Sequence, residues 1–187
     1  PSSTADARTR LRRAYFDLTG LPPSPEQTDS FLKAAAGNLD AAYSSLLDEL
    51  LASTQYRERW GRHWLALVRF AESNGYAFDK DRKNAFRHRD FVIRALNADM
   101  PYDEFVRLQV AGDLIRPKDL EAVSATGFLV AGPFTTQQTQ KERERSRYEQ
   151  LDDMVHILGT SMLGLSIGCA RCHEHKYDPV SQEDYYR

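Results

Sequence analysis

Apolar residues along this chain recur mostly at the three- and four-residue spacing of an amphipathic α-helix. The first set is Leu11, Ala14, Tyr15 and Leu18, which gives a predicted helix one apolar face. Gly20 and two consecutive prolines follow. Because glycine and proline commonly end helices, we expect the first helix to end there.

The next segment carries the signature of a helix start. Residues 24–27 read Ser-Pro-Glu-Gln, which supplies an N-cap, a proline at the first helical position and a capping-box partner. Ser53 or Thr54 can cap a later helix, and Asn74-Gly75 predicts its end. The apolar positions that define these helices are Phe31, Leu32, Tyr43, Leu46, Leu47, Leu50, Leu51, Trp60, Trp64, Leu67 and Val68.

Helical spacing continues through the second half of the chain. We expect one helix over residues 86–97, a short one around 105–109 and a longer one ended by Gly168. The inward face of the longer helix is predicted to carry Leu151, Met154, Val155, Leu158, Met162 and Leu165. The pattern predicts an all-α fold, an irregular multi-helix domain of roughly six to eight helices.

Composition narrows the class of protein. The 187 residues, 41% of them apolar, fit a single helical domain over residues 1–187, which we interpret as a fragment of a longer chain. The net charge of -2 provides no general attraction for nucleic acid, so we expect no nucleic-acid partner. The apolar runs are too short for a membrane-spanning helix, and we expect no membrane span in this segment.

The two cysteines of the chain lie together near its end, in Cys169-Ala170-Arg171-Cys172-His173. This spacing allows both thiols to face one way on a helical turn and to add to the two vinyl groups of a haem. The imidazole of His173 would then be presented to the haem iron. The motif predicts haem c as the cofactor, with Cys169 and Cys172 as its attachment points and His173 as the iron ligand.

Three other interpretations of the cluster stay open. The cysteines could form a disulfide or a redox dithiol beside His173. Cys169, Cys172, His173 and His175 could hold zinc, although Cys172 and His173 lack the loop that usually separates pairs of zinc ligands. Both thiols could also be buried residues without chemistry, beside a surface histidine.

A second axial ligand for the iron has few candidates. His63 lies between Trp60 and Trp64 on a predicted helix, where it is either a ligand or a satisfied core histidine. His175 is too close to His173 to reach the opposite side of the same iron, but it could contact a second metal. The remaining candidates are three methionines, two of which fit core positions, and two histidines with polar-face character: Met100, Met154, Met162, His88 and His156.

Several segments together resemble the planctomycete-type cytochrome-associated domain of unknown function. They are residues 12–23, 60–65, 69–75, 86–93, 109–114, 151–153 and 168–179, which span nearly the whole chain. The resemblance implies a large exported protein with a periplasmic or extracellular location, often with a further uncharacterised domain. One departure is Ala66, where relatives usually carry an aspartate; its loss weakens a role for His63.

These observations support three functional hypotheses. The first is an electron-transfer or redox module of an exported multidomain protein, whose partner is a redox protein or an adjacent domain of the same chain. The alternative is a structural or scaffolding domain, with a Cys/His metal or disulfide site that supports a neighbouring catalytic domain. A third is a hydrolase that uses Glu72, Asp113 or Asp153 with a bound metal, although such acids are usually solvated or paired.

Overall fold

The structure is a computed structural model that describes residues 4–75 and 79–187. The described residues contain nine α-helices and no named strand, so the predicted all-α fold is confirmed. They form two compact units, one ending at His63 and one beginning at Trp64, and each is described by itself. The assignment of residues 1–187 to one domain stays a prediction.

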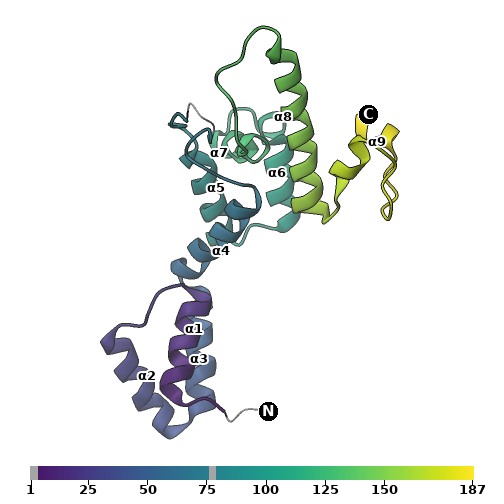
Figure 1. Cartoon of the computed structure of the whole chain (residues 1–187). Helices are drawn as coiled ribbons and strands as arrows, with labels where there is room; N and C mark the ends of the chain where they lie inside the picture. Colours follow the sequence, from purple (N-terminus) through teal and green to yellow (C-terminus); the bar gives the residue numbers. More distant parts are fainter. Residues whose placement is uncertain (1–3, 76–78) are drawn as a thin grey trace. The chain divides into compact units, whose positions relative to one another are not determined.

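The N-terminal unit is built from α1 (Ala7–Leu18), α2 (Pro25–Gly37), α3 (Leu39–Ala52) and the first part of α4 (Thr54–Leu67). Its helices α1, α2 and α3 lie against one another (Figure 1). The predicted capping box is confirmed, because the Ser24 hydroxyl accepts from the Gln27 amide and the Gln27 side chain accepts from the Ser24 amide. The buried core of this unit is Leu11, Ala14, Tyr15, Phe31, Leu46 and Leu50.

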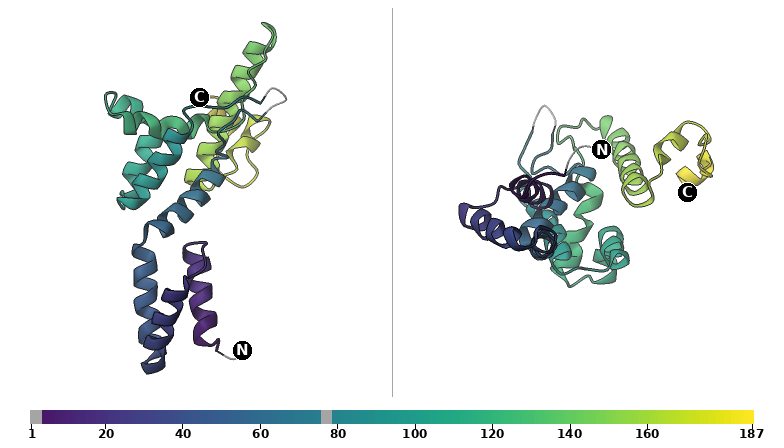
Figure 2. Two further views of the ribbon diagram at one scale, coloured as in Figure 1. Left: turned by 90° about the vertical axis from the view of Figure 1, so that its left-hand side faces the viewer. Right: turned by 90° about the horizontal axis from the view of Figure 1, so that it is seen from below.

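The second unit contains α5 (Phe86–Asn97), α6 (Tyr102–Ile115), α7 (Leu120–Ala125) and the 3₁₀ helix η1 (Thr126–Val130). Helix α8 (Glu142–Leu158) follows, continued by the π-turn η2 (Gly159–Leu163). The chain ends with the 3₁₀ helix η3 (Ile167–Arg171) and α9 (Gln182–Tyr186). The segment that contains η3 and α9 runs beside α8 in both views of Figure 2 and in Figure 1.

Trp64 joins the two hydrophobic clusters of this unit. One cluster is centred on Phe91 and Phe105, the other on Val68 and Phe128, and the Trp64 side chain packs against both. Its indole N–H donates to the Oε1 of Gln109 at 2.8 Å. Gln109 is fully buried and also donates to the Phe105 carbonyl. The Trp64 indole and the Gln109 side chain are therefore hydrogen-bonded, as buried polar groups require.

Helix α6 is longer than the short helix predicted around residues 105–109, and the ends of two other helices also differ from the prediction. Helix α4 ends at Leu67 rather than at Asn74-Gly75, because Arg69 adopts a positive φ of 56° and directs its guanidinium to Asp153. The long helix stops before Gly168. After η2 the chain turns at Gly164, which has a left-handed φ of 66° and caps the π-turn.

The inward face of α8 also differs from the prediction. Leu151 and Val155 are 45% and 37% exposed, whereas Ile157 is buried at 3%. The physical reason is an ion pair between Asp153 and Arg69, which lies against Gly132. This ion pair sets the rotation of α8 about its axis. No described helix has the length and apolarity to cross a membrane.

Candidate functional site

Cys169 lies within the 3₁₀ helix η3, and Cys172 is the C-cap of that helix. The Cys169 amide donates to the Ser166 carbonyl at 3.0 Å, and the Cys172 amide approaches the Cys169 carbonyl at 3.5 Å. Both side chains are exposed free thiols. The interpretation as two buried thiols is therefore wrong, and both sulfurs are accessible to a reaction partner.

The two residues between the cysteines hold the segment in place. Ala170 is fully buried in η3, which contacts α8. The Arg171 guanidinium lies 2.8 Å from a carboxylate oxygen of Asp152 on α8. A buried small residue and a paired cation thus fix the turn against the helix and leave the flanking thiols outside.

The Asp152 carboxylate connects three parts of the C-terminal segment. One oxygen accepts from Arg171, and the other accepts from the Tyr185 hydroxyl of α9. Burial and the hydrogen bond to Asp152 raise the pKa of Tyr185, while the charge of Asp152 raises the pKa of Arg171. The Arg171 carbonyl accepts from the Tyr186 hydroxyl and from the side-chain amide of Gln182. Helix α9 therefore closes over the backbone of the motif.

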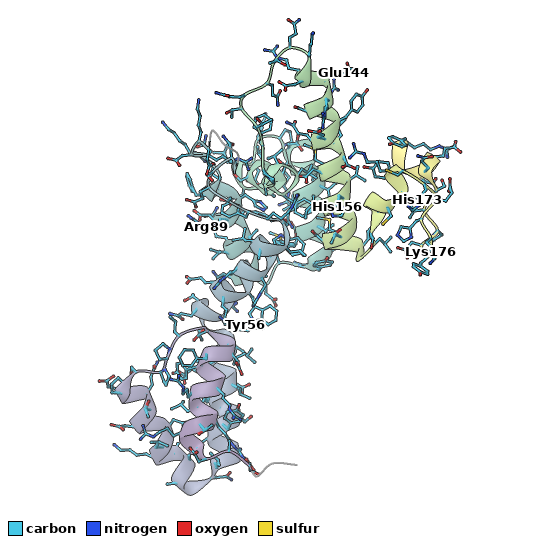
Figure 3. The ribbon with its side chains drawn as sticks, in the orientation of Figure 1. Tyr56, Arg89, Glu144, His156, His173 and Lys176 are labelled. Atoms are coloured by element: carbon cyan, nitrogen blue, oxygen red, sulfur yellow. The ribbon has the colours of Figure 1, made fainter. Side chains whose placement is uncertain are left out.

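His173 presents one ring nitrogen to solvent. Its Nδ1 lies 2.8 Å from the Glu174 carbonyl oxygen, which can only accept a hydrogen bond. This contact favours the tautomer of the neutral ring that carries its proton on Nδ1 and its lone pair on Nε2. Metal-binding histidines usually have this arrangement, in which a backbone carbonyl fixes the tautomer. Figure 3 shows His173 on the segment beside α8, with His156 on the helix itself.

His175 fixes the loop that follows the motif. Its Nδ1 accepts from the backbone amides of Tyr177 and Asp178 at 3.2 and 2.8 Å. Its Nε2 lies 3.4 Å from the Asp178 carboxylate, and its side chain is 7% exposed. Both ring nitrogens are engaged, so a metal at His175 would have to displace these contacts. Its role as a ligand stays a prediction.

His63 lies on α4 in the N-terminal unit, where its ring packs edge-on against Trp60 at a centroid distance of 5.2 Å. The cysteines belong to the other unit, and a role for His63 at the iron stays a prediction.

Among the other ligand candidates, Met100 and Met162 pack against the two hydrophobic clusters of the second unit. His156 is exposed, as predicted, and lies against Gly168, the residue before Cys169.

The predicted carboxylates do not converge. Asp153 binds Arg69 through both oxygens at 2.5 and 2.9 Å, and Glu72 binds Arg89 at 2.5 Å. Among residues 4–75 and 79–187, no three His, Cys, Asp or Glu side chains are arranged to hold a metal ion. Neither the zinc interpretation of the cysteine cluster nor the metal hydrolase gains support from this arrangement.

The second unit contains a large cavity that sequence reasoning missed. It has a volume of about 1080 Å³ and extends between α5, α6, η1 and α8. His88 lines it and is only 4% exposed, so its interpretation as a polar-face residue is wrong. A signal was present in the sequence: His88 precedes Phe91 and Ala95 by three and seven residues, which places it on the apolar face of α5.

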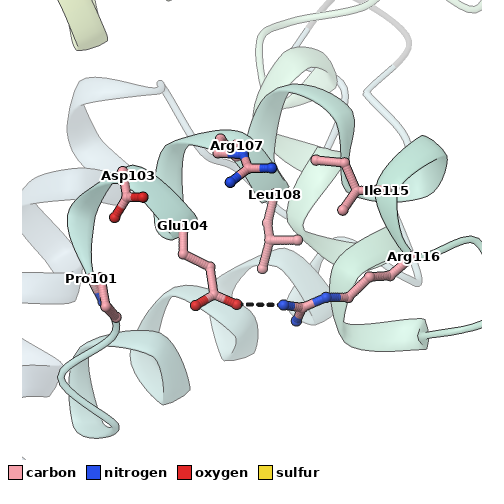
Figure 4. Close-up of a pocket in the computed structure, with 7 residues that line it drawn as sticks. All are labelled: Pro101, Asp103, Glu104, Arg107, Leu108, Ile115 and Arg116. Atoms are coloured by element: carbon pink, nitrogen blue, oxygen red, sulfur yellow. Dashed lines mark hydrogen bonds and ion pairs between the residues drawn. The ribbon is translucent and has the colours of Figure 1, made fainter.

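A smaller cavity of about 270 Å³ lies along α6 (Figure 4). Glu104 and Arg116, from the two ends of the helix, form an ion pair of 2.6 Å across it. A kink at Ala111 with non-helical backbone angles bends the helix between them. Asp103 and Arg107 also line this cavity, which therefore carries equal numbers of acidic and basic side chains, and we assign it a structural role.

Of three comparisons with known proteins, one found a match. A family model described as a protein of unknown function matches residues 1–187. No curated protein and no solved structure matches the chain.

Proposed function

We propose a c-type haem site for this chain, which belongs to the PSCyt2 family (DUF1549), a planctomycete-type cytochrome-associated domain of unknown function. In this proposal Cys169 and Cys172 attach the haem through thioether bonds, and His173 binds the iron. The chain would then be an electron-transfer or redox module of an exported, periplasmic or extracellular protein. Its partner would be a redox protein or an adjacent domain.

The contact between His173 Nδ1 and the Glu174 carbonyl, beside two exposed thiols, is the observation that carries this proposal. The Glu174 carbonyl accepts from Nδ1 and leaves Nε2 as the electron-pair donor, which is the form that binds iron. The two thiols are exposed and free, so thioether formation requires no opening of the fold. Two thiols and one imidazole are the groups that attachment of a c-type haem requires.

The rest of the segment supports the attachment mechanically. Ala170 and Arg171 hold the turn against α8, so the thiols keep their separation when the porphyrin is attached. When bound, the haem supplies a one-electron iron centre whose potential depends on ligands, hydrogen bonds and exposure. Because both cysteines are at the surface, an electron partner can approach the porphyrin edge directly.

The proposal is tested by a pyridine haemochrome spectrum and an intact mass of protein exported with haem-maturation machinery. We expect one covalent haem per chain, lost in the Cys169→Ala/Cys172→Ala variant. His173→Ala should keep the covalent mass while it changes the spectrum of the iron, and Tyr148→Ala, at an exposed position of α8, is the control that leaves the spectrum unchanged. Haem-free wild-type protein carrying a disulfide or stoichiometric zinc would overturn the proposal and favour the scaffolding alternative.

A further inference from the structure

The large cavity of the second unit is a candidate ligand site separate from the cysteine segment. Its walls are mostly apolar and partly exposed. They include Val110 and Leu114 of α6, Val123 of α7, Val130 of η1 and Phe134 beyond it. Ligand sites usually combine such walls with a few polar groups, and a volume of about 1080 Å³ accommodates a drug-sized molecule.

The charges that line the cavity do not cancel. Of its acids, Asp153 is neutralised by Arg69 and Glu149 by Arg145, which leaves Asp113 without an ion pair in the described part of the chain.

Three cations also line the cavity without a carboxylate in ion-pair contact: Arg82, Lys83 and Arg87. Arg82 donates to the carbonyls of residues 130–132 and to the Asn74 side chain. Lys83 and Arg87 have no described carboxylate partner.

The start of α5 adds to this positive potential. Its N-cap Ala85 makes no side-chain hydrogen bond, and no acidic residue lies in its first turn. A basic, uncapped N-terminus is unfavourable for an isolated helix, because the helix dipole is positive at that end. The first amides of α5 are already engaged, since the Arg87 N–H donates to the Asn84 carbonyl at 3.2 Å and the His88 N–H donates to the Ala85 carbonyl at 3.0 Å. The helix start therefore contributes its dipole, not free N–H groups, to the potential of the cavity.

His88, in the same first turn, is an unsatisfied polar side chain. It is 96% buried, and neither ring nitrogen makes a well-formed hydrogen bond among the described residues, although the backbone of Ser124 and Ala125 lies close enough to raise its pKa slightly. Gly127 lies against its ring, because a Cβ there would be 2.7 Å from the His88 Cβ. An unsatisfied buried polar group is costly. A ligand that accepts from this imidazole would remove that cost.

We propose that this cavity binds a small organic oxyanion, with an apolar or ring-containing body and a carboxylate, sulfonate or phosphate head group. Lys83 and Arg87 bind the head group, and the His88 imidazole donates to it after a small adjustment of the ring. The apolar walls of α6, α7 and η1 contact the body. Burial lowers the pKa of His88 to about 4 against a weaker opposite influence of the Ser124 and Ala125 backbone, so the ring is a neutral donor at neutral pH.

The test uses a matched pair of fluorescent probes on the full chain. 8-Anilinonaphthalene-1-sulfonate carries the aromatic body with an oxyanion, and N-phenyl-1-naphthylamine carries nearly the same body without it. We expect the sulfonate to bind more tightly, and Lys83→Gln/Arg87→Gln to weaken its binding about tenfold while the amine is little affected. The control Lys118→Gln/Arg143→Gln removes two exposed cations that lie outside the cavity and should leave both affinities unchanged.

Competition and NMR spectroscopy identify the head group and the location. Benzoate, benzenesulfonate and phenyl phosphate compete with the sulfonate probe, and the strongest competitor identifies the preferred oxyanion. The ring signals of His88 should shift on binding. Equal binding of the two probes, equal weakening by the control variant, or unchanged His88 signals would overturn the proposal. Circular dichroism of each variant excludes unfolding as the cause of a lost affinity.

Discussion

The Arg171 guanidinium lies 2.8 Å from the Asp152 carboxylate, and this contact joins the middle of the cysteine motif to α8. The partners are 45% and 27% exposed, so the direct energy of the pair is small. Its importance is geometric, because Asp152 also accepts from Tyr185. One carboxylate thus holds both the motif and the helix that closes over it.

Asp152→Ala should loosen the cysteine segment without unfolding the protein. We expect amide hydrogen exchange across residues 166–173 to accelerate, because local opening no longer breaks the contacts of Asp152. Glu149→Ala is the control, since Glu149 lies on the same helix and makes only an exposed pair with Arg145. If both variants exchanged at the wild-type rate in this segment, the carboxylate would have no holding role.

Two glycine substitutions should differ sharply in their effect on stability. A Cβ at Gly112 would lie 2.1 Å from the backbone oxygen of Ala122, whereas a Cβ at Gly37 meets nothing within 4 Å. We expect Gly112→Ala to lower the free energy of unfolding by about 2 kcal/mol or more. Gly37→Ala should be neutral or stabilise by about 0.5 kcal/mol. Urea unfolding measures both, and equal effects would contradict the close approach of α6 and α7.

His88 should make the protein less stable in mild acid. Its pKa is about 4 in the folded protein and close to 6.5 in an unfolded chain. The unfolded state therefore binds the proton more readily, and the contribution of His88 is fully present above about pH 6.5 and is lost as the pH falls through about 4. The difference between the folded and unfolded pKa values of His88 corresponds to a change of roughly 3 kcal/mol in the free energy of unfolding.

The measurement for His88 is the free energy of unfolding as a function of pH. His88→Gln should remove the slope over this range, whereas His156→Gln, at an exposed position, should keep it. A slope that persists in His88→Gln would assign the acid sensitivity to other groups.

His175→Ala should open the loop after the motif. Two backbone amides, those of Tyr177 and Asp178, lose their acceptor in this variant, so the loop can enter a protease site. We expect faster tryptic cleavage after Lys176, followed by mass spectrometry. Tyr148→Ala is the control, because the Tyr148 side chain is 61% exposed and lies on α8, away from the cleaved bond. Faster cleavage in the control as well would show that the imidazole does not hold the loop.

Much of the helical architecture could be predicted from local pattern, because caps and amphipathic stripes are local signals. The capping box at Ser24 and the first helix end near Gly20 are examples. The end of α4 could not be predicted, since it depends on Arg69 reaching Asp153, which lies 84 residues later in the chain. Pairing over such a distance leaves no periodic signal.

Only part of the candidate site could be predicted from the sequence, because the remaining features depend on contacts between residues that are distant in the chain. The spacing of Cys169, Cys172 and His173 is visible in the sequence, and their exposure and the His173 tautomer required coordinates. The cavity around His88 was missed because its walls come from helices that are distant in sequence. Its lining includes residues of α5, α6, η1 and α8, which no short motif connects.

Asp152 and Asp153 are consecutive on α8, and they bind in different directions. Asp152 binds Arg171 of the cysteine segment, and Asp153 binds Arg69 at the wall of the large cavity. Successive side chains on a helix point about 100° apart, so one rigid rod is anchored on two sides. A turn of α8 about its axis would displace both carboxylates together. The turn that carries the cysteines and the wall of the cavity are therefore coupled through α8. A rotation of this helix that displaces one of them also displaces the other.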